Sequence, residues 1–210
     1  MLTQQGAGAL LFQRADVSGS VSLNGSHVLK EQGFSLVELL VAMAISGTLM
    51  LGAAKLLPLL QIQNLQILAG FQLREELQQI MLTLEKAVRR AGYCNGQCGG
   101  EGLYIDAATG SCMLIKWDEN SNGKWEGIDH YESEFYGYRI RNASMEMQRG
   151  VSRCEGAGWE RISDPGFVVI TQFTVRREKR LIKLRLAGYA VAFPSQRITI
   201  EHWVSGINLR

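Results

Sequence analysis

One carboxylate, Glu38, lies inside an apolar run that is long enough to cross a membrane. The run extends from Leu36 to Leu60, and its one other charged residue is Lys55. A helix of about 20 such residues spans a hydrocarbon core of roughly 30 Å. A carboxylate at that depth costs about 2.5–3.5 kcal/mol, whereas a lysine near the end of the run can extend its ammonium to the interface. We therefore predict that Glu38 is functional and has a cationic partner.

The residues before this run form a processing motif. Lys30-Glu31-Gln32-Gly33 is followed by Phe34-Ser35-Leu36-Val37-Glu38, and this resembles the cleavage and methylation motif of type IV pilins and type II secretion pseudopilins. The resemblance implies that a prepilin peptidase cuts after Gly33 and that the new amino-terminal Phe34 is N-methylated. It also implies that Glu38 pairs with the terminal amine of a neighbouring subunit, an arrangement in which the two charges share their desolvation cost. The alternative is an ordinary signal anchor.

The motif divides the chain into three parts. Residues 1–33 would be a leader that is removed, residues 34–60 the membrane-spanning half of a long helix, and residues 61–210 a periplasmic domain. The leader is polar and lacks the apolar core of a secretory signal peptide. Translation from Val28 would leave a short basic leader. The resemblance places the protein in the inner membrane, with a single pass and its carboxy-terminal domain in the periplasm.

The rest of the chain predicts an α+β fold. Apolar residues at helical spacing predict that the membrane helix continues outward, with a bend at Pro58. After Gly92 the pattern alternates, which predicts strands at 102–105, 112–117, 135–141, 167–175, 181–192 and 197–204. The resemblance implies the same pilin-like architecture, a long amino-terminal helix packed on an antiparallel sheet. The residues expected on the packed face of the helix are Leu65, Leu68, Leu73, Leu77, Ile80, Leu84, Val88 and Ala91.

The four cysteines are Cys94, Cys98, Cys112 and Cys154, and all follow the membrane run. An even number in a small exported domain predicts two disulfides, because the periplasm is oxidising. Three pairings are open to four cysteines. We favour Cys94 with Cys98, which closes a tight loop after the helix, and Cys112 with Cys154, which ties an early strand to a later loop. A zinc site is disfavoured, because the spacings do not repeat a CxxC knuckle.

A polar segment from Asp118 to Asp129 resembles an EF-hand-type calcium loop. Oxygen-bearing side chains at alternate positions and a central glycine let such a loop wrap one Ca²⁺. The candidate ligands are Asp118, Asn120, Asn122, Lys124 and Asp129. Asp129 is shorter than the glutamate usual at the last position, and no helical pattern flanks the loop. The alternative is a polar hairpin around Asn122-Gly123.

Charge and motif content bear on the function classes. The formal net charge is +2, with 22 basic and 20 acidic residues, so we expect no nucleic-acid partner. The most basic stretch, residues 176–180, is predicted to be a solvated hairpin loop in preference to a polyanion-binding tip. His27, His130 and His202 lie in no recognisable catalytic motif. We therefore predict that the protein is not an enzyme and needs no cofactor other than a possible Ca²⁺.

Three further segments are similar to J-type minor pseudopilins: residues 89–94, the Cys112 strand running into Trp117-Asp118, and residues 154–159. The resemblance implies a minor pilin or pseudopilin in a tip initiation complex that primes a type IV pilus or a type II secretion pseudopilus. Its partners would be other minor pilins, the major pilin, the prepilin peptidase and the inner-membrane assembly platform. The alternative function is a membrane-tethered periplasmic binding or enzymatic domain that uses the prepilin export route.

Overall fold

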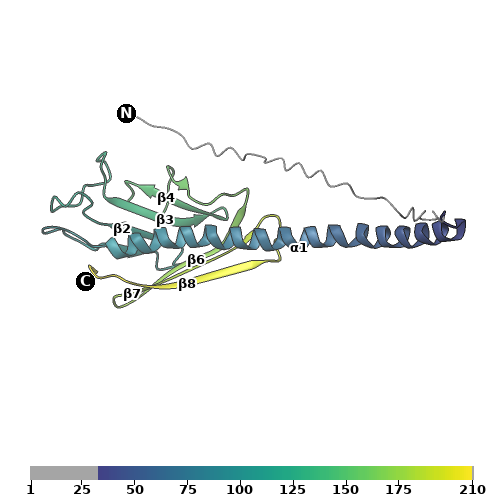
Figure 1. Cartoon of the computed structure of the whole chain (residues 1–210). Helices are drawn as coiled ribbons and strands as arrows, with labels where there is room; N and C mark the ends of the chain where they lie inside the picture. Colours follow the sequence, from purple (N-terminus) through teal and green to yellow (C-terminus); the bar gives the residue numbers. More distant parts are fainter. Residues whose placement is uncertain (1–32, 210) are drawn as a thin grey trace, which may run out of the picture. The chain divides into compact units, whose positions relative to one another are not determined.

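The computed structural model describes residues 33–209, which form one long helix and eight strands (Figure 1). The predicted leader, residues 1–33, lies outside the described residues except for Gly33. The chain divides into two compact units, one ending at Leu51 and the other beginning at Gly52. Helix α1, Leu36–Arg90, continues through Pro58 as one element.

The strands form two antiparallel sheets in the second unit. The first sheet has the order β1-β2-β3-β4-β5, and the second has the order β6-β7-β8. Their bounds are β1 Leu103–Ile105, β2 Cys112–Lys116, β3 Phe135–Arg141, β4 Ser144–Arg149, β5 Glu160–Arg161, β6 Val168–Glu178, β7 Leu181–Ala190 and β8 Arg197–Ser205. The α+β, pilin-like fold is therefore as predicted, although the strands are shared between two sheets.

A single large core joins α1 to both sheets. From Ala69 onward, one face of α1 is buried together with inward residues such as Met113 of β2, Ile182 of β7 and Val204 of β8. Leu65 and Leu68 were expected on this packed face, but 56% and 53% of their surfaces are exposed. The expectation was wrong for these two residues, because the buried face of α1 begins only at Ala69.

Gly92 ends α1 and starts the change to strands. Its φ of 82° is in the left-handed region, where a helix commonly ends on glycine. Its N–H donates to the Lys116 carbonyl at 2.8 Å, and a Cβ at this position would lie 2.7 Å from the Asn208 carbonyl oxygen. The end of the helix is thus tied both to the first sheet and to the carboxy-terminal segment.

Two short strands, β4 and β5, were not predicted. β3 turns into β4 through Asn142 and Ala143, which both have positive φ. Such two-residue turns usually carry glycine at the second position. Because alanine occupies it here, the sequence lacks the Asn-Gly pattern that predicts a hairpin. The predicted basic loop at 176–180 was also too long, because β6 extends to Glu178 and leaves only Lys179 and Arg180 between the strands.

A second, smaller apolar cluster covers the face of the first sheet that points away from the main core. It contains Cys112 and Leu114 of β2 and Val151, with Cys154 and Trp159 packed against it. Gly137 of β3 leaves the space for this packing, since a Cβ there would lie 2.6 Å from Trp159 and 2.7 Å from Val151. The segment 151–159 therefore packs closely against the first sheet.

Buried Tyr138 makes the fold sensitive to alkaline pH. Burial raises the pKa of Tyr138 to about 12, above its ordinary value of 10.0. The stability gained from the neutral phenol is therefore complete below pH 10 and is lost as the pH rises through 12. We expect Tyr138→Phe to flatten the decline in stability over this range, as measured by urea unfolding. Tyr104→Phe, at an exposed site, is the control, and equal slopes in both variants would contradict the prediction.

Candidate functional site

Glu38 lies in the first turn of α1 and folds back toward the start of the helix. The Ser35 N–H donates to Glu38 Oε2 at 3.3 Å, and the Leu39 N–H donates to the Ser35 carbonyl at 3.1 Å. This is the Glu half of a capping box, in which the third helical residue satisfies the N–H of the residue before the helix. The helix dipole also favours a carboxylate here. The arrangement aims Glu38 at the residues where processing would occur.

The predicted cleavage position is exposed. Gly33 and Phe34 precede the helix in non-helical conformation, and 86% of the Phe34 surface is exposed. An amine formed on Phe34 would be one residue from the Ser35 N–H that Glu38 already accepts. Sequence reasoning did not assign a role to Ser35, although the Ser-x-x-Glu spacing at 35–38 was available as a signal.

The helix that carries Glu38 has the properties of a membrane span. Among the described residues it is the one helix long and apolar enough, with an 18-residue window of mean hydropathy 2.0 that is entirely unburied. No atom outside the helix backbone lies within 4 Å of a Cβ built at Gly47 or Gly52. Gly47 and Gly52 therefore leave space at which another helix can approach closely.

The four cysteines form the two disulfides that we favoured. Cys94 is bonded to Cys98, and Cys112 is bonded to Cys154. The first bond closes a short loop directly after α1. The second fixes the 151–159 segment to β2 across the smaller apolar cluster.

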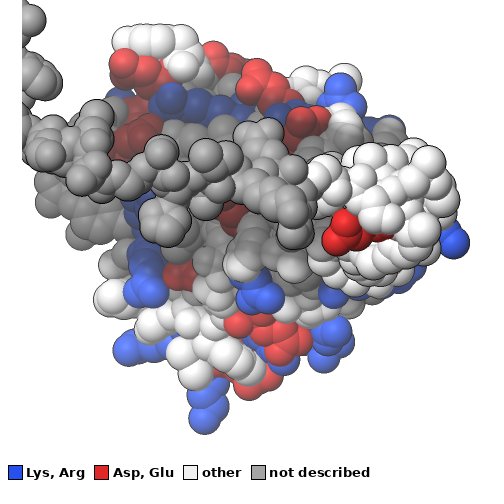
Figure 2. Space-filling view, turned by 45° about the vertical axis from the view of Figure 1, so that its right-hand side comes forward, with Lys and Arg blue, Asp and Glu red and all other residues white. Residues whose placement is uncertain are grey.

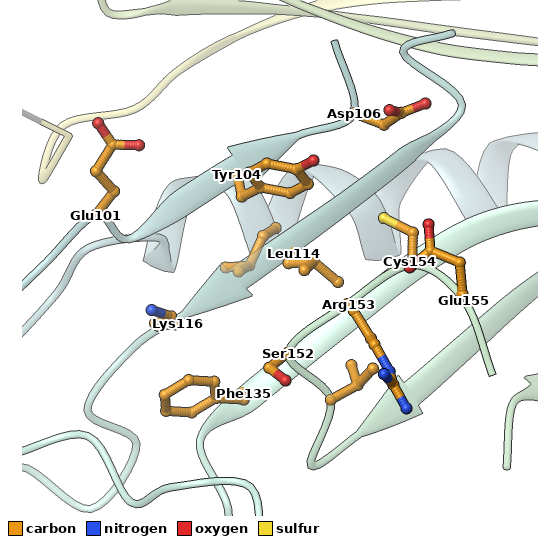
Figure 3. A pocket seen from close by; sticks show the side chains of 12 residues that line it. Glu101, Tyr104, Asp106, Leu114, Lys116, Phe135, Ser152, Arg153, Cys154 and Glu155 are labelled. Atoms are coloured by element: carbon orange, nitrogen blue, oxygen red, sulfur yellow. The ribbon is translucent and has the colours of Figure 1, made fainter. Parts of the chain in front are cut away.

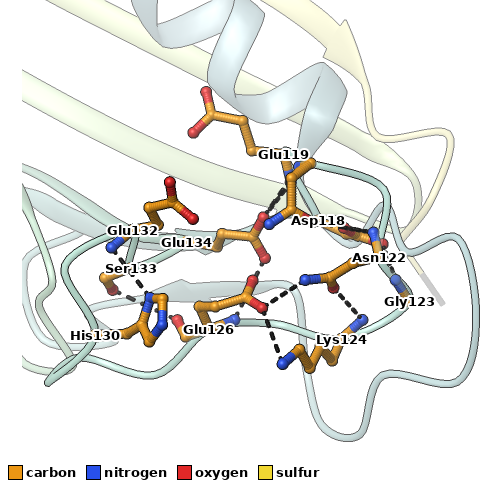
Figure 4. A network of polar contacts seen from close by, with 11 residues as sticks. Asp118, Glu119, Asn122, Gly123, Lys124, Glu126, His130, Glu132, Ser133 and Glu134 are labelled. Atoms are coloured by element: carbon orange, nitrogen blue, oxygen red, sulfur yellow. Dashed lines mark hydrogen bonds and ion pairs between the residues drawn. The ribbon is translucent and has the colours of Figure 1, made fainter.

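The predicted calcium loop is ordered mainly by its own side chains (Figure 4). Asp118 is buried, and its carboxylate accepts the N–H groups of Asn95, Asn122 and Gly123. Burial raises the pKa of Asp118, but these N–H groups outweigh it and hold the pKa below its ordinary value. The side-chain oxygens of Asn120 and Asn122 accept the N–H groups two residues on. These bonds hold the backbone of residues 118–124 in a tight turn.

Asp129, the acid expected at the last position of this loop, is not buried. Asp129 is exposed, whereas Glu126 and Glu134 are 7% and 1% exposed and were not predicted. Within residues 33–209, no three His, Cys, Asp or Glu side chains form a cluster that could hold a metal ion. The five-residue ligand set stays a prediction, and Asp129 is an exposed member of it. Glu126 occupies position nine of the motif that begins at Asp118. This position also supplies a ligand in EF-hand loops, and it could have marked Glu126 as a candidate.

A cavity of about 350 Å³ lies beside β1 and β2 (Figure 3). It is lined by apolar side chains and by charges of both signs, and its cysteine, Cys154, is in a disulfide. The lining contains no histidine, so it offers no activated nucleophile of the Cys–His or Ser–His type. Its lining residues include Tyr104, Asp106, Leu114, Lys116, Phe135 and Arg153.

Charges of the two signs are mixed on the face of the molecule drawn in Figure 2. On the face drawn in Figure 2, Lys and Arg side chains alternate with Asp and Glu side chains. Several form pairs, including Lys183 and Arg185 with Glu201 at 3.2 Å each. This distribution differs from the concentrated basic face of a nucleic-acid-binding protein.

Comparison with known proteins gives a consistent result over most of the chain. Residues 66–206 match the family model described as prepilin peptidase-dependent protein B, and residues 29–54 match the prokaryotic N-terminal methylation motif. The curated prepilin peptidase-dependent protein B of Escherichia coli (strain K12) is 38% identical over 186 residues, which cover 86% of this chain and 99% of the relative. No solved structure matches the chain.

Proposed function

Because this chain belongs to the prepilin peptidase-dependent protein B family, we propose that it is a minor pilin that primes the assembly of a type IV pilus or a type II secretion pseudopilus. The observation that carries this proposal is Glu38. It is an acid in the first turn of α1, beside an apolar, unburied stretch, and its carboxylate accepts the N–H of Ser35, the residue after the predicted new amino terminus.

The proposed sequence of events begins with cleavage. The prepilin peptidase cuts the exposed Gly33–Phe34 bond, and Phe34 is N-methylated. The resulting ammonium on one subunit then pairs with Glu38 of the next as the second helix leaves the lipid. Pairing removes two unfavourable isolated charges from the membrane in one step, which gives the docking of helices both direction and register.

The second unit supplies the partner-specific part of the proposed tip complex. Its two sheets share one apolar core and its loops carry two disulfides, which suits a subunit that must present fixed surfaces to other minor pilins in the periplasm. Exposed apolar residues of α1 near the start of the core, Leu65, Leu68 and Phe71, add to the surface available to neighbouring helices. We propose that other minor pilins, the major pilin and the assembly platform contact the protein along these surfaces.

Two measurements test the proposal. Mass spectrometry of the mature chain from wild-type cells should find Phe34 as a methylated first residue. Cells that lack this chain should assemble few filaments although they make the major pilin, and supplying the chain should restore the number. Filament numbers equal to those of the parent strain would contradict priming and would favour a membrane-tethered binding domain.

A further inference from the structure

Strand β8 is an open edge of the second sheet. The sheet has the order β6-β7-β8, so β8 pairs with β7 on one side only (Figure 1). The Gly206 N–H donates to the Arg180 carbonyl at 2.8 Å, and the bonded pairs of an antiparallel ladder recur at every second residue from there. The main-chain groups of residues 198, 200, 202 and 204 therefore bond to β7, and those of residues 197, 199, 201, 203 and 205 point away from it.

The opposite edge of this sheet is closed. The Ile170 N–H of β6 donates to the Ala143 carbonyl at 2.9 Å, and the Val175 N–H donates to a second loop carbonyl at 2.8 Å. Within residues 33–209, β8 makes no such bond beyond those to β7. It is nine residues long, with no proline and no register shift against β7. Proteins usually shorten, bulge or interrupt an exposed edge strand to prevent its pairing with another chain, so β8 is suited to accept a further strand.

The outer face of the second sheet carries more basic than acidic side chains. Residues such as Ile182, Ile200 and Val204 are buried against the core, so their sequence neighbours point outward. The outward basic residues are Arg176, Lys183, Arg185 and Arg197, and the outward acidic residues are Glu178 and Glu201. Glu201 is already paired with Lys183 and Arg185. Acidic side chains on an added strand would therefore be favoured.

Trp203 gives the same face an apolar centre beside the open edge. Its side chain is 49% exposed, and the Lys183 ammonium lies 5.4 Å from its ring centroid. Leu181 on the neighbouring strand is 48% exposed. Tryptophan is prominent among the residues that dominate binding energy at protein interfaces. A polyphosphate would gain little from these apolar groups and would be repelled by Glu178 and Glu201, so a protein segment fits the face better.

We propose that β8 pairs with an extended segment of a different pilin-like subunit, which adds a fourth strand to the second sheet and places an acidic side chain beside Arg197 and an apolar one beside Trp203. This inference rests on the proposed function, which supplies the neighbouring subunits. Main-chain bonds would give affinity and the side chains would select the partner, as in other cases of strand addition. A second copy of this chain fits less well, because β1 and β5 have only three and two residues and β8 itself has no excess of acid.

Photo-cross-linking in filament-forming cells tests the pairing with the full chain. The photoreactive residue p-benzoylphenylalanine replaces Trp203. Ultraviolet light should then give an adduct, and mass spectrometry should identify its partner as a protein with a prepilin-type leader, joined through a segment that contains acidic residues. The same probe at Tyr104, which is 52% exposed on β1, reports on the first sheet as a comparison.

Two variants of the chain that carries the Trp203 probe separate main-chain pairing from charge. Thr199→Pro removes an N–H that points away from β7, where an edge strand tolerates proline, and should lower the adduct yield about tenfold. Arg197→Glu keeps the main chain intact and should lower the yield about threefold. Arg153→Glu, which reverses an exposed arginine outside the second sheet, is the matched control and should leave the yield unchanged. The melting temperature of each chain in detergent shows that it is folded, and adducts of the Tyr104 probe should not respond.

Each outcome decides the proposal. Reduction of the adduct by either folded variant supports strand addition. The absence of an adduct at Trp203, an adduct with nucleic acid, lipid or a second copy of this chain, or a yield that neither variant lowers would overturn it. Filaments are counted in cells with and without the chain. If filaments need the chain but no adduct forms, strand addition is wrong and priming stands; if the adduct forms and responds while filaments do not need the chain, priming is wrong and strand addition stands.

Discussion

Replacing Glu38 with Gln is expected to reduce incorporation of this subunit into filaments by roughly a hundredfold while cleavage after Gly33 continues. In the proposed assembly step, the variant leaves the terminal ammonium of the neighbouring subunit without a counter-charge in lipid. The penalty for one such charge is about 2.5–3.5 kcal/mol, and a tenfold change in an equilibrium corresponds to about 1.4 kcal/mol. The measurement is the amount of this subunit, and of major pilin, in filaments sheared from cells that express the variant.

Cleavage and assembly must be scored separately in this experiment. The mass of the membrane-bound chain reports removal of residues 1–33, which is expected to be unaffected because the carboxylate is not at the predicted scissile bond. Glu75→Gln removes an exposed acid from the same helix, outside the apolar run, and should leave incorporation unchanged. Normal incorporation of the Glu38→Gln subunit would contradict the proposed pairing of Glu38 with the terminal ammonium of a neighbouring subunit. An uncleaved variant would show instead that the acid is needed for processing.

Replacing Cys112 and Cys154 together with Ala is expected to destabilise the second unit by about 4 kcal/mol, a large part of the stability of an ordinary domain. The bond joins residues 42 apart in sequence, so its loss releases a long loop in the unfolded chain. It also frees the 151–159 segment from the smaller apolar cluster on β2. Urea unfolding under non-reducing conditions, followed by tryptophan fluorescence, measures the change in the free energy of unfolding.

The other disulfide provides the matched comparison. Cys94 and Cys98 are four residues apart, and loop-closure entropy predicts a loss of only about 2 kcal/mol when both become Ala. The ranking therefore tests the mechanism as well as the size of the effect. Equal losses for the two double variants would argue against the entropic explanation, and a larger loss for the Cys94–Cys98 pair would contradict it.

Much of the second unit was predictable because its signals are periodic. Six of the strands coincide with alternating segments, and the buried face of α1 from Leu73 to Val88 follows the helical spacing. The predictions were wrong where the same local sequence pattern is compatible with more than one tertiary environment. Leu65 and Leu68 have the same spacing as Leu73, yet they lie before the part of the helix that the domain core covers. The β3–β4 turn uses Asn142 and Ala143, and alanine is not the residue that signals this turn.

The amino-terminal segment that is proposed to act in assembly could be recognised from the order of its residues alone. The motif residues lie within the short segment 33–38. Their relations depend on one helical turn and on the apolar run that follows, so no long-range contact is needed to recognise them.

Long-range contacts, in comparison, set which acids are buried at the 118–134 loop. Glu126 and Glu134 are brought together by hydrogen bonds from Glu119 and Asn120, and by an attachment to Tyr93 far earlier in the chain. Asp129, which the motif spacing favoured, is left in solvent. The physical reason is that burial of a carboxylate depends on donors from several segments, and the spacing within one segment does not specify where those donors will be.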